Sequence, residues 1–400
     1  MATNTNASHE NAGQRNSTTD SFRPATSPAA ALPPPLSAKD PKGFAYKTLR
    51  ERLAVILTRA MDTVSGDAAE IERQKGPEAR QDIQVVVERL AKLRDEITAN
   101  KPLIALEDDF QDAAVWNAVL QQYTVENKGC PPRWYLLVTH SLIHSSLWGN
   151  RCDLSLSCGA DASGQAGSLL KTDALRSCII SDHTDQLWEH LVKLRQQNLG
   201  GKPTQLHCVM DNSGYELAAD LALFDFLHAS GFVAAVTIHV KAIPWYVSDV
   251  MRRDLSWTLR KMRECDHEAT RALGERCQRR IDEGVWSVLD DIFWTQPFDY
   301  AQMATRRPGL YKLLQSADLV LFKGDVNYRK LVGDLEWDPS VPFHQVLRGF
   351  DPTFLCTLRT IKSNTVAGVD RSVVRDVAQR SADWMITGEY AVLQCAGVTA

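Results

Sequence analysis

Acidic and amide side chains stand directly after several apolar runs of this sequence. They are Asp211 and Asn212 after one run, Asp249 after the next and Asp325 after a third, with Glu216 close behind the first pair. Carboxylate and amide oxygens suit Mg²⁺ or Mn²⁺, whereas thiolate and imidazole groups suit zinc. The pattern therefore predicts a divalent-cation site built from oxygen ligands.

Basic residues accompany these acids. They are Lys323, Arg329, Arg359 and Lys362, which lie in or just after the same apolar runs. A divalent ion beside Lys and Arg is a common way for proteins to bind a phosphate group. The residues by themselves thus indicate phosphate-ester chemistry, and they do not rank Asp249 above Asp325 as a metal ligand.

Helix capping offers a simpler interpretation of the same residues. Ser213 with Glu216 matches a capping box, and Asp249 and Asp325 both precede helical stretches in which Asp often caps. Arg359 and Lys362 would fit a solvated face equally well. What favours a site is that several such loops would meet at one edge of a sheet.

The elements that must position these residues are short apolar strands that alternate with helices after about residue 165. The expected strands are Cys178–Ile180, Leu206–Met210, Val233–Val240, Leu319–Phe322 and Phe354–Leu358, and the clearest helices are Glu216–His228 and Ser248–Arg263. This alternation predicts an α/β protein with a mostly parallel sheet covered by helices. Ligands of such sheets bind outside the carboxyl ends of the strands, where the acidic and basic residues lie.

The sequence as a whole predicts that the chain has three parts. Residues 1–40 are rich in Asn, Ser, Thr, Ala and Pro and read as a disordered tail, residues 41–165 as a mainly helical region, and residues 166–400 as the α/β domain. Apolar residues three and four apart mark helices around Leu53 and Leu90, and a further one over 116–123.

Composition narrows the class of protein. The 400 residues are 44% hydrophobic and 24% charged, with a net charge of −4, so we expect no nucleic-acid or membrane partner. No apolar stretch is long enough to span a membrane, and the nine cysteines contain no CxxC pair. We expect a protein with reduced thiols in the cytoplasm or the nucleus, monomeric in the first instance. No GxGxxG, GxxxxGK[ST] or GxSxG motif occurs, which argues against dinucleotide enzymes, P-loop NTPases and α/β-hydrolases.

Taken together, these segments resemble the metal-dependent damage-control phosphatase family, formerly a domain of unknown function. The resemblance rests on Asp211-Asn-Ser-Gly-Tyr-Glu216, the segment from Lys241 to Asp249, the segment from Lys323 to Leu331, and Leu147-Trp-Gly-Asn150. Arg359-Thr-Ile-Lys362 is similar to the RTxK signature of its third, acidic residue methyltransferase-like subfamily. The resemblance extends from about residue 40 to the end of the chain.

The resemblance implies a fold and a site. The fold would be an N-terminal helical region packed on a three-layer αβα sandwich with a Rossmann-like core. A divalent metal, Mn²⁺ first and Ni²⁺, Co²⁺ or Mg²⁺ as alternatives, would be held by Asp211, Asn212 and Asp249. Substrate contacts are implied for Asp211, Asn212, Glu216, Asp325, Val326, Asn327, Tyr328, Arg329 and Lys362, and catalytic roles for Asp211, Asp249 and Asp325.

The implied reaction is hydrolysis of small phosphorylated sugars, with fructose 1-phosphate and fructose 6-phosphate as typical substrates. The nucleophile is either water on the metal or Asp211 itself, and the residues do not choose between them. Two alternatives stay open. One is S-adenosylmethionine-dependent O-methylation of protein glutamate, although no Gly-rich loop follows the first strand. The other is a non-catalytic protein that binds phosphorylated sugars.

Overall fold

A computed structural model describes residues 32–34, 43, 46–99, 132–152 and 175–397. The predicted tail falls almost wholly outside these residues, and the predicted helix over 116–123 lies outside them entirely. Within the described part, no helix is both long enough and apolar enough to cross a membrane.

The first described helices form where apolar residues recur every three or four positions. They are η1 (Lys47–Arg52, a π-helix), α2 (Leu53–Gly66), α3 (Ala68–Lys75) and α4 (Ala79–Thr98). Helix α2 packs on α4, and it buries Leu57 and Met61, which are one helical turn apart. The apolar face of α4 is only partly buried, as the 42% exposed fraction of Val85 shows.

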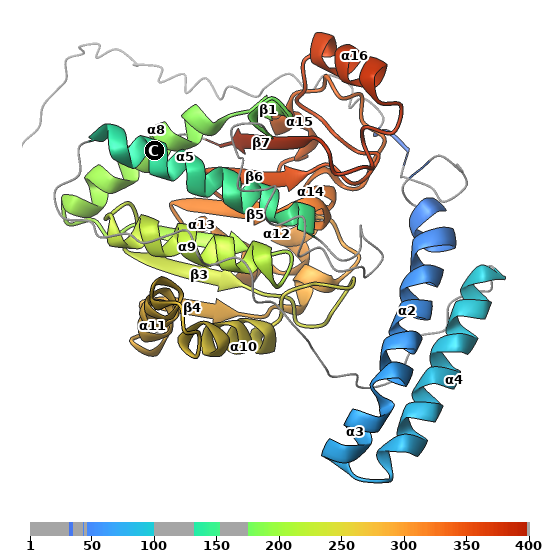
Figure 1. Ribbon diagram of the computed structural model, residues 1–400. Helices are drawn as coiled ribbons and strands as arrows, with labels where there is room; N and C mark the ends of the chain where they lie inside the picture. Colours follow the sequence, from blue (N-terminus) through green and yellow to red (C-terminus); the bar gives the residue numbers. More distant parts are fainter. Residues whose placement is uncertain (1–31, 35–42, 44–45, 100–131, 153–174, 398–400) are drawn as a thin grey trace, which may run out of the picture. The chain divides into compact units, whose positions relative to one another are not determined.

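The α/β part is built on a seven-stranded sheet (Figure 1). The strands are β1 (Ile179–Asp182), β2 (Gln205–Val209), β3 (Ala235–His239), β4 (Trp286–Leu289), β5 (Leu319–Lys323), β6 (Leu355–Thr360) and β7 (Ala391–Ala396), in the order β1-β7-β6-β5-β2-β3-β4. Every neighbouring pair is parallel except β6 and β7. The five predicted strands are therefore present, and the structure adds β4 and β7.

Helices cover both faces of this sheet. They are α5 (Pro132–Gly149), η3 (Asn150–Cys152), α8 (Thr184–Leu199), α9 (Tyr215–Ala229), α10 (Arg252–Arg263), α11 (Glu268–Asp282), η4 (Ile292–Thr295), η5 (Tyr300–Gln302), α12 (Met303–Arg306), α13 (Pro308–Gln315), α14 (Gly324–Val332), α15 (Phe343–Val346) and α16 (Arg371–Arg380). Helix α5 packs on α9, whereas α14 packs against β5 and β6. The result is the expected three-layer αβα sandwich.

Strand β5 shows how one apolar run serves both layers. Leu319 and Leu321 belong to the core cluster that includes α5 and α9, and Val320 and Phe322 belong to the cluster that includes α14. Successive side chains of a strand point to opposite faces, so a strand covered on both sides must be apolar throughout. All five residues of β5 are buried, namely the four apolar residues Leu319–Phe322 and Lys323, which ends the strand.

The chain direction across the sheet reverses between β2 and β5. From β2 the chain proceeds outward to β3 and β4, and it then returns to β5 on the other side of β2 and continues to β6. The carboxyl ends of these parallel strands share one edge, and a crevice forms where the order reverses. The segments that begin at Asp211 and Gly324 leave the sheet at this switch point.

Candidate active site

The predicted site residues follow the carboxyl ends of β2, β3, β5 and β6, and most are buried. Buried are Asp211, Asn212, Glu216, Asp249, Asp325, Asn327, Tyr328 and Lys362. Val326 and Arg329, on α14, are partly exposed. Buried polar groups need partners, so their contacts define what each can do.

A short backbone pairing brings the segments after β2 and β3 together. Asn212 and Asp249 form an isolated antiparallel bridge, and the Val250 amide donates to the Asp211 carbonyl at 2.9 Å. Asp211, Asn212 and Asp249 are thereby fixed next to one another although about forty residues separate them in sequence. The pairing also explains why α10 begins at Arg252 and not at Ser248 as predicted.

The side chains of the acid–amide pair are oriented by their neighbours. Asn212 Nδ2 donates to Asp211 Oδ2 at 3.1 Å and to Glu216 Oε2 at 2.9 Å, and Asn212 Oδ1 accepts from Ser248 Oγ at 2.9 Å. Asp249 Oδ2 accepts from the backbone amide of Tyr246. These contacts fix the rotamers of an all-oxygen donor set.

The capping interpretation does not describe these residues. Glu216 receives the amide groups of site residues, and the N-cap of α9, Gly214, has no side-chain cap. Helix α10 is capped by Asp254 Oδ2, which accepts from the Met251 amide at 2.9 Å. The Asp325 carboxylate accepts from Arg359 in β6 and from Lys362 and Ser363 just after it. The carboxylates of Glu216, Asp249 and Asp325 thus face the switch point of the sheet.

Asn150 connects four parts of the site, and it was not among the predicted site residues. Its Nδ2 donates to Asp211 Oδ2 and to Glu216 Oε2, both at 2.8 Å. Its Oδ1 accepts from Thr360 Oγ1 at 2.6 Å, and its backbone carbonyl accepts from Lys362 Nζ at 2.5 Å. The sequence did single out this segment, because Leu147-Trp-Gly-Asn150 belongs to the family resemblance, but the resemblance assigned no role to Asn150.

A glycine lets the end of α5 approach α9 closely enough for these contacts. A Cβ atom at Gly149 would lie 2.9 Å from the Glu216 Cα atom, closer than real contacts allow. The Leu147-Trp-Gly-Asn150 segment therefore delivers Asn150 into the site because position 149 has no side chain.

Lys323 lies beneath the site in a buried ion cluster. Its Nζ lies 3.3 Å from Glu216 Oε1 and 3.1 Å from Asp220 Oδ1, and it donates to the Ser146 carbonyl. Burial raises the pKa of Asp220 to about 7. Burial lowers the pKa of Lys323, but the two carboxylates raise it by more, so its pKa is above the ordinary value. Lys323 balances the charge of Glu216 from inside the protein.

The RTxK segment positions Asp325. Asp325 Oδ1 accepts from Arg359 Nε at 2.8 Å, from the Lys362 amide at 3.1 Å and from Ser363 Oγ at 3.1 Å. Arg359 is fully buried and also donates to the Thr365 carbonyl at 2.7 Å. Arg359 is therefore a structural partner of Asp325, whereas Lys362 extends to Asn150 beside Asp211.

Asn327 and Lys241 lie behind the carboxylates. Asn327 Nδ2 donates to the carbonyls of Val209, Met210 and Lys323, and its Oδ1 accepts from Lys241 Nζ at 2.9 Å. Burial lowers the pKa of Lys241, and the nearby carboxylates of Asp211 and Asp249 oppose that shift. A substrate contact for Asn327 stays a prediction, and so does one for Tyr328, whose ring lies 4.0 Å below the Arg359 guanidinium carbon.

The donor set fits a hard divalent cation by its chemistry. The predicted ligands are two carboxylates and one amide, and no group of three His, Cys, Asp or Glu side chains suited to a metal occurs in the described residues. Gly324 has φ +78°, and a Cβ there would lie 1.7 Å from Asp211 Oδ2. The bare backbone thus leaves room for the Asp211 carboxylate.

Comparison with known proteins shows the family of the chain. A family model described as the damage-control phosphatase ARMT1-like domain matches residues 109–377. The chain belongs to this family. Two relatives are both named damage-control phosphatase ARMT1. The Danio rerio protein is 33% identical to this chain, and the alignment covers 91% of this chain and 97% of the relative. The Homo sapiens protein is 32% identical, and the alignment covers 92% of this chain and 99% of the relative. A Xenopus tropicalis protein of the same name is 30% identical, covering 90% and 98%.

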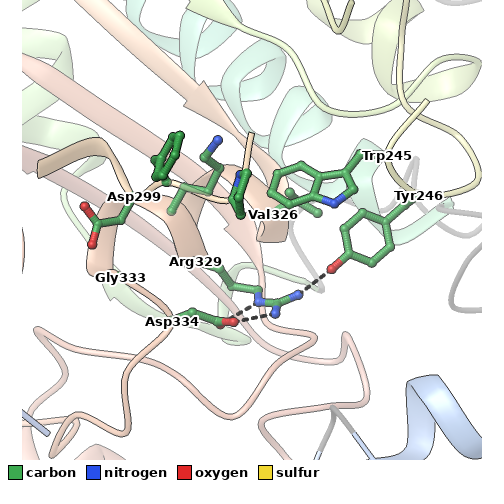
Figure 2. Close-up of a pocket in the computed structure, with 10 residues that line it drawn as sticks. Trp245, Tyr246, Asp299, Val326, Arg329, Gly333 and Asp334 are labelled. Atoms are coloured by element: carbon green, nitrogen blue, oxygen red, sulfur yellow. Dashed lines mark hydrogen bonds and ion pairs between the residues drawn. The ribbon is translucent and has the colours of Figure 1, made fainter. Parts of the chain in front are cut away.

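Beside these residues lies a pocket of about 250 Å³ (Figure 2). Its lining includes Trp245 and Tyr246 from the segment after β3, and Val326, Arg329 and Asp334 from α14 and the residues after it. Arg329 is held by Asp334 through two hydrogen bonds of 2.7 and 2.6 Å, and by Tyr246 Oη at 2.8 Å. Arg329 is therefore part of the pocket wall.

Proposed function

We propose that the chain is a metal-dependent phosphomonoesterase that hydrolyses sugar phosphates of the fructose 1-phosphate and fructose 6-phosphate type, in metabolite damage control. The observation that carries the proposal is the paired placement of Asp211, Asn212 and Asp249 at the switch point, with Lys362 joined to them through Asn150. The family to which the chain belongs supports the reaction class.

Asp211, Asn212 and Asp249 would hold the divalent ion. Mn²⁺ is the first choice and Mg²⁺ an alternative because all three donors are oxygens. Ni²⁺ and Co²⁺ are further alternatives that the family resemblance implies. When bound, the ion supplies neutralisation of the charge that builds on the phosphate oxygens. Asn150 and Ser248 keep the side chains of Asp211 and Asn212 turned toward it.

The remaining residues act on the ester. Lys362 Nζ lies at the carbonyl of Asn150 and can turn to a phosphate oxygen without leaving the site. In hydrolysis a water oxygen bonds to phosphorus, the bond from phosphorus to the sugar oxygen breaks, and a proton is transferred to that sugar oxygen. Asp325, fixed by Arg359, is the proposed group that binds the leaving oxygen or donates that proton. Whether water or Asp211 attacks first stays open.

A phosphate-release assay on a panel of sugar phosphates tests the proposal. The purified full chain is incubated with each ester in EDTA and then with Mn²⁺, Ni²⁺, Co²⁺ or Mg²⁺. We expect release only with metal, and most from fructose 1-phosphate. Absence of release with every metal from a folded protein would contradict the proposal and favour methyl transfer or sugar-phosphate binding.

The proposal extends to where and how the protein acts. We place it in the cytoplasm or the nucleus as a monomer that binds a small phosphorylated sugar. The support is compositional, namely nine cysteines without a CxxC pair and a net charge of −4. Sedimentation of the purified chain and fractionation of cells that express it would test both statements.

A further inference from the structure

Two segments of the chain connect the pocket lining to the site carboxylates. Tyr246 lines the pocket, and its amide donates to Asp249. Val326 lines the pocket from the position next to Asp325 on α14. A phosphate bound among the carboxylates would therefore direct the organic part of its ester into this pocket.

Every charged side chain of the pocket lining already has a partner in the described structure. Asp299 binds Arg348 Nη1 at 2.7 Å, and Arg329 binds Asp334. Lys330 Nζ donates to the carbonyls of Phe293, Trp294 and Gln296 at 2.8 to 3.1 Å. A second anionic group on the ligand would have to displace one of these partners, which would leave a buried or half-buried charge without its counter-ion.

The other lining residues offer an apolar surface. Trp245 is 37% exposed, although large aromatic side chains are usually buried, and it stands with Phe298 and Val326. Figure 2 shows Trp245 next to Tyr246, whose hydroxyl contacts Arg329. The volume of about 250 Å³ is below the roughly 300–1,000 Å³ of pockets for drug-sized ligands, so it suits a small metabolite.

We propose that this pocket receives the uncharged, hydroxylated end of the substrate, with Trp245 as the platform for its carbon face and the Arg329–Asp334 pair as the element that excludes a second phosphate. The inference rests on the proposed function and adds a selectivity to it. Monophosphates of neutral sugars or polyols are accepted, and bisphosphates and sugar-acid phosphates are rejected.

The first test removes the platform. Trp245→Ala should raise KM for fructose 1-phosphate about tenfold, leave kcat within about twofold, and leave kcat/KM for methyl phosphate, which has no sugar, within about twofold. Trp245→Phe should restore most of the loss, since an aromatic face is retained. Ile243→Ala is the matched control, because Ile243 is an exposed apolar residue of the same segment outside the pocket. Equal losses with both esters would overturn the platform role.

The second test releases Arg329. Asp334 has φ +56°, a conformation that Asn also adopts readily, so Asp334→Asn preserves the backbone while it removes the carboxylate. We expect the ratio of kcat/KM for fructose 1,6-bisphosphate to that for fructose 1-phosphate to rise at least fivefold. An unchanged ratio, or a wild-type enzyme that already prefers the bisphosphate, would overturn the exclusion.

A binding measurement separates failure of this inference from failure of the proposed function. If no ester is hydrolysed with any metal, the hydrolase proposal fails, and calorimetry of fructose 1-phosphate in the presence of Mn²⁺ then tests the pocket alone. Binding that is about tenfold weaker in Trp245→Ala than in Ile243→Ala would sustain the inference. Equal binding by the two variants, or none by the wild type, would overturn it.

Discussion

At the scale of single residues, the site is held by side chains from distant parts of the sequence. The acid–amide pair Asp211-Asn212 and the acid Asp249 could be recognised because each follows an apolar run. Asn150 lies in a segment that resembles the family, but its role could not be predicted, because its four partners lie 61 to 212 positions away. Lys323 looked like a phosphate ligand, and the structure instead pairs it with Glu216 and Asp220.

Replacing Asn150 should weaken the site without unfolding the protein. Asn150→Ala removes one of the two side-chain amides that donate to the carboxylates of Asp211 and Glu216, the other being Asn212, and loss of such supporting bonds usually costs about 10- to 100-fold in metal affinity or activity. Asn150→Asp should reduce phosphate release further, because it adds a third negative charge beside those of Asp211 and Glu216. Mn²⁺ titration of phosphate release measures both. Asn198→Ala, which removes one bond to the Gly231 carbonyl, is the control, and equal behaviour of the two alanine variants would contradict the assignment.

At the scale of elements, the parallel strands were predictable and two others were not. Runs such as Leu319–Phe322 are apolar throughout, which is typical of strands buried on both faces. β7 is interrupted by the buried polar residue Gln394, and β4 begins with Trp286-Ser287, so neither shows a continuous apolar run. The predicted start of α10 at Ser248 was wrong, because the backbone pairing of Asn212 with Asp249 keeps the residues before Arg252 out of the helix.

The junction of β5 and α14 should tolerate no side chain at position 324. Gly324→Ala would place a Cβ atom 1.7 Å from Asp211 Oδ2 at a φ of +78°, so either the carboxylate or the helix start must move. We expect at least a hundredfold loss of phosphate release and a lower melting temperature. Gly309→Ala in α13 meets nothing within 4 Å and should be neutral or stabilise by up to about 1 kcal/mol. A fully active Gly324→Ala enzyme would show that Asp211 is not confined there.

At the scale of the whole molecule, the core contains histidines that are held neutral. His207 on β2 is buried, its Nδ1 lies 3.1 Å from His239 Nε2, and burial lowers the pKa of His207 to about 4. A depressed pKa gives stability that is complete above the unfolded value of 6.5 and is lost as the pH falls through about 4. Protonation of His207 would place a charge inside the sheet, so we expect acid to destabilise the sheet.

We expect the free energy of unfolding to fall by roughly 3 kcal/mol from His207 alone between pH 6.5 and pH 4. Urea unfolding at several pH values measures this slope. His207→Gln removes the titrating group and should flatten the slope, whatever it does to stability at pH 7. A slope that is identical in the variant would assign the acid sensitivity to other groups.

The measurement that tests the account most directly is phosphate release from fructose 1-phosphate at limiting Mn²⁺ by the wild type and by Asp249→Ala. Asp249 is buried and backbone-paired to Asn212, and its carboxylate is proposed as the third oxygen donor of the metal site. Asp351→Ala, at an exposed acid, is the control. We expect wild-type and control activity that depends on Mn²⁺, and at least a hundredfold loss in Asp249→Ala. Wild-type turnover by Asp249→Ala would contradict the account.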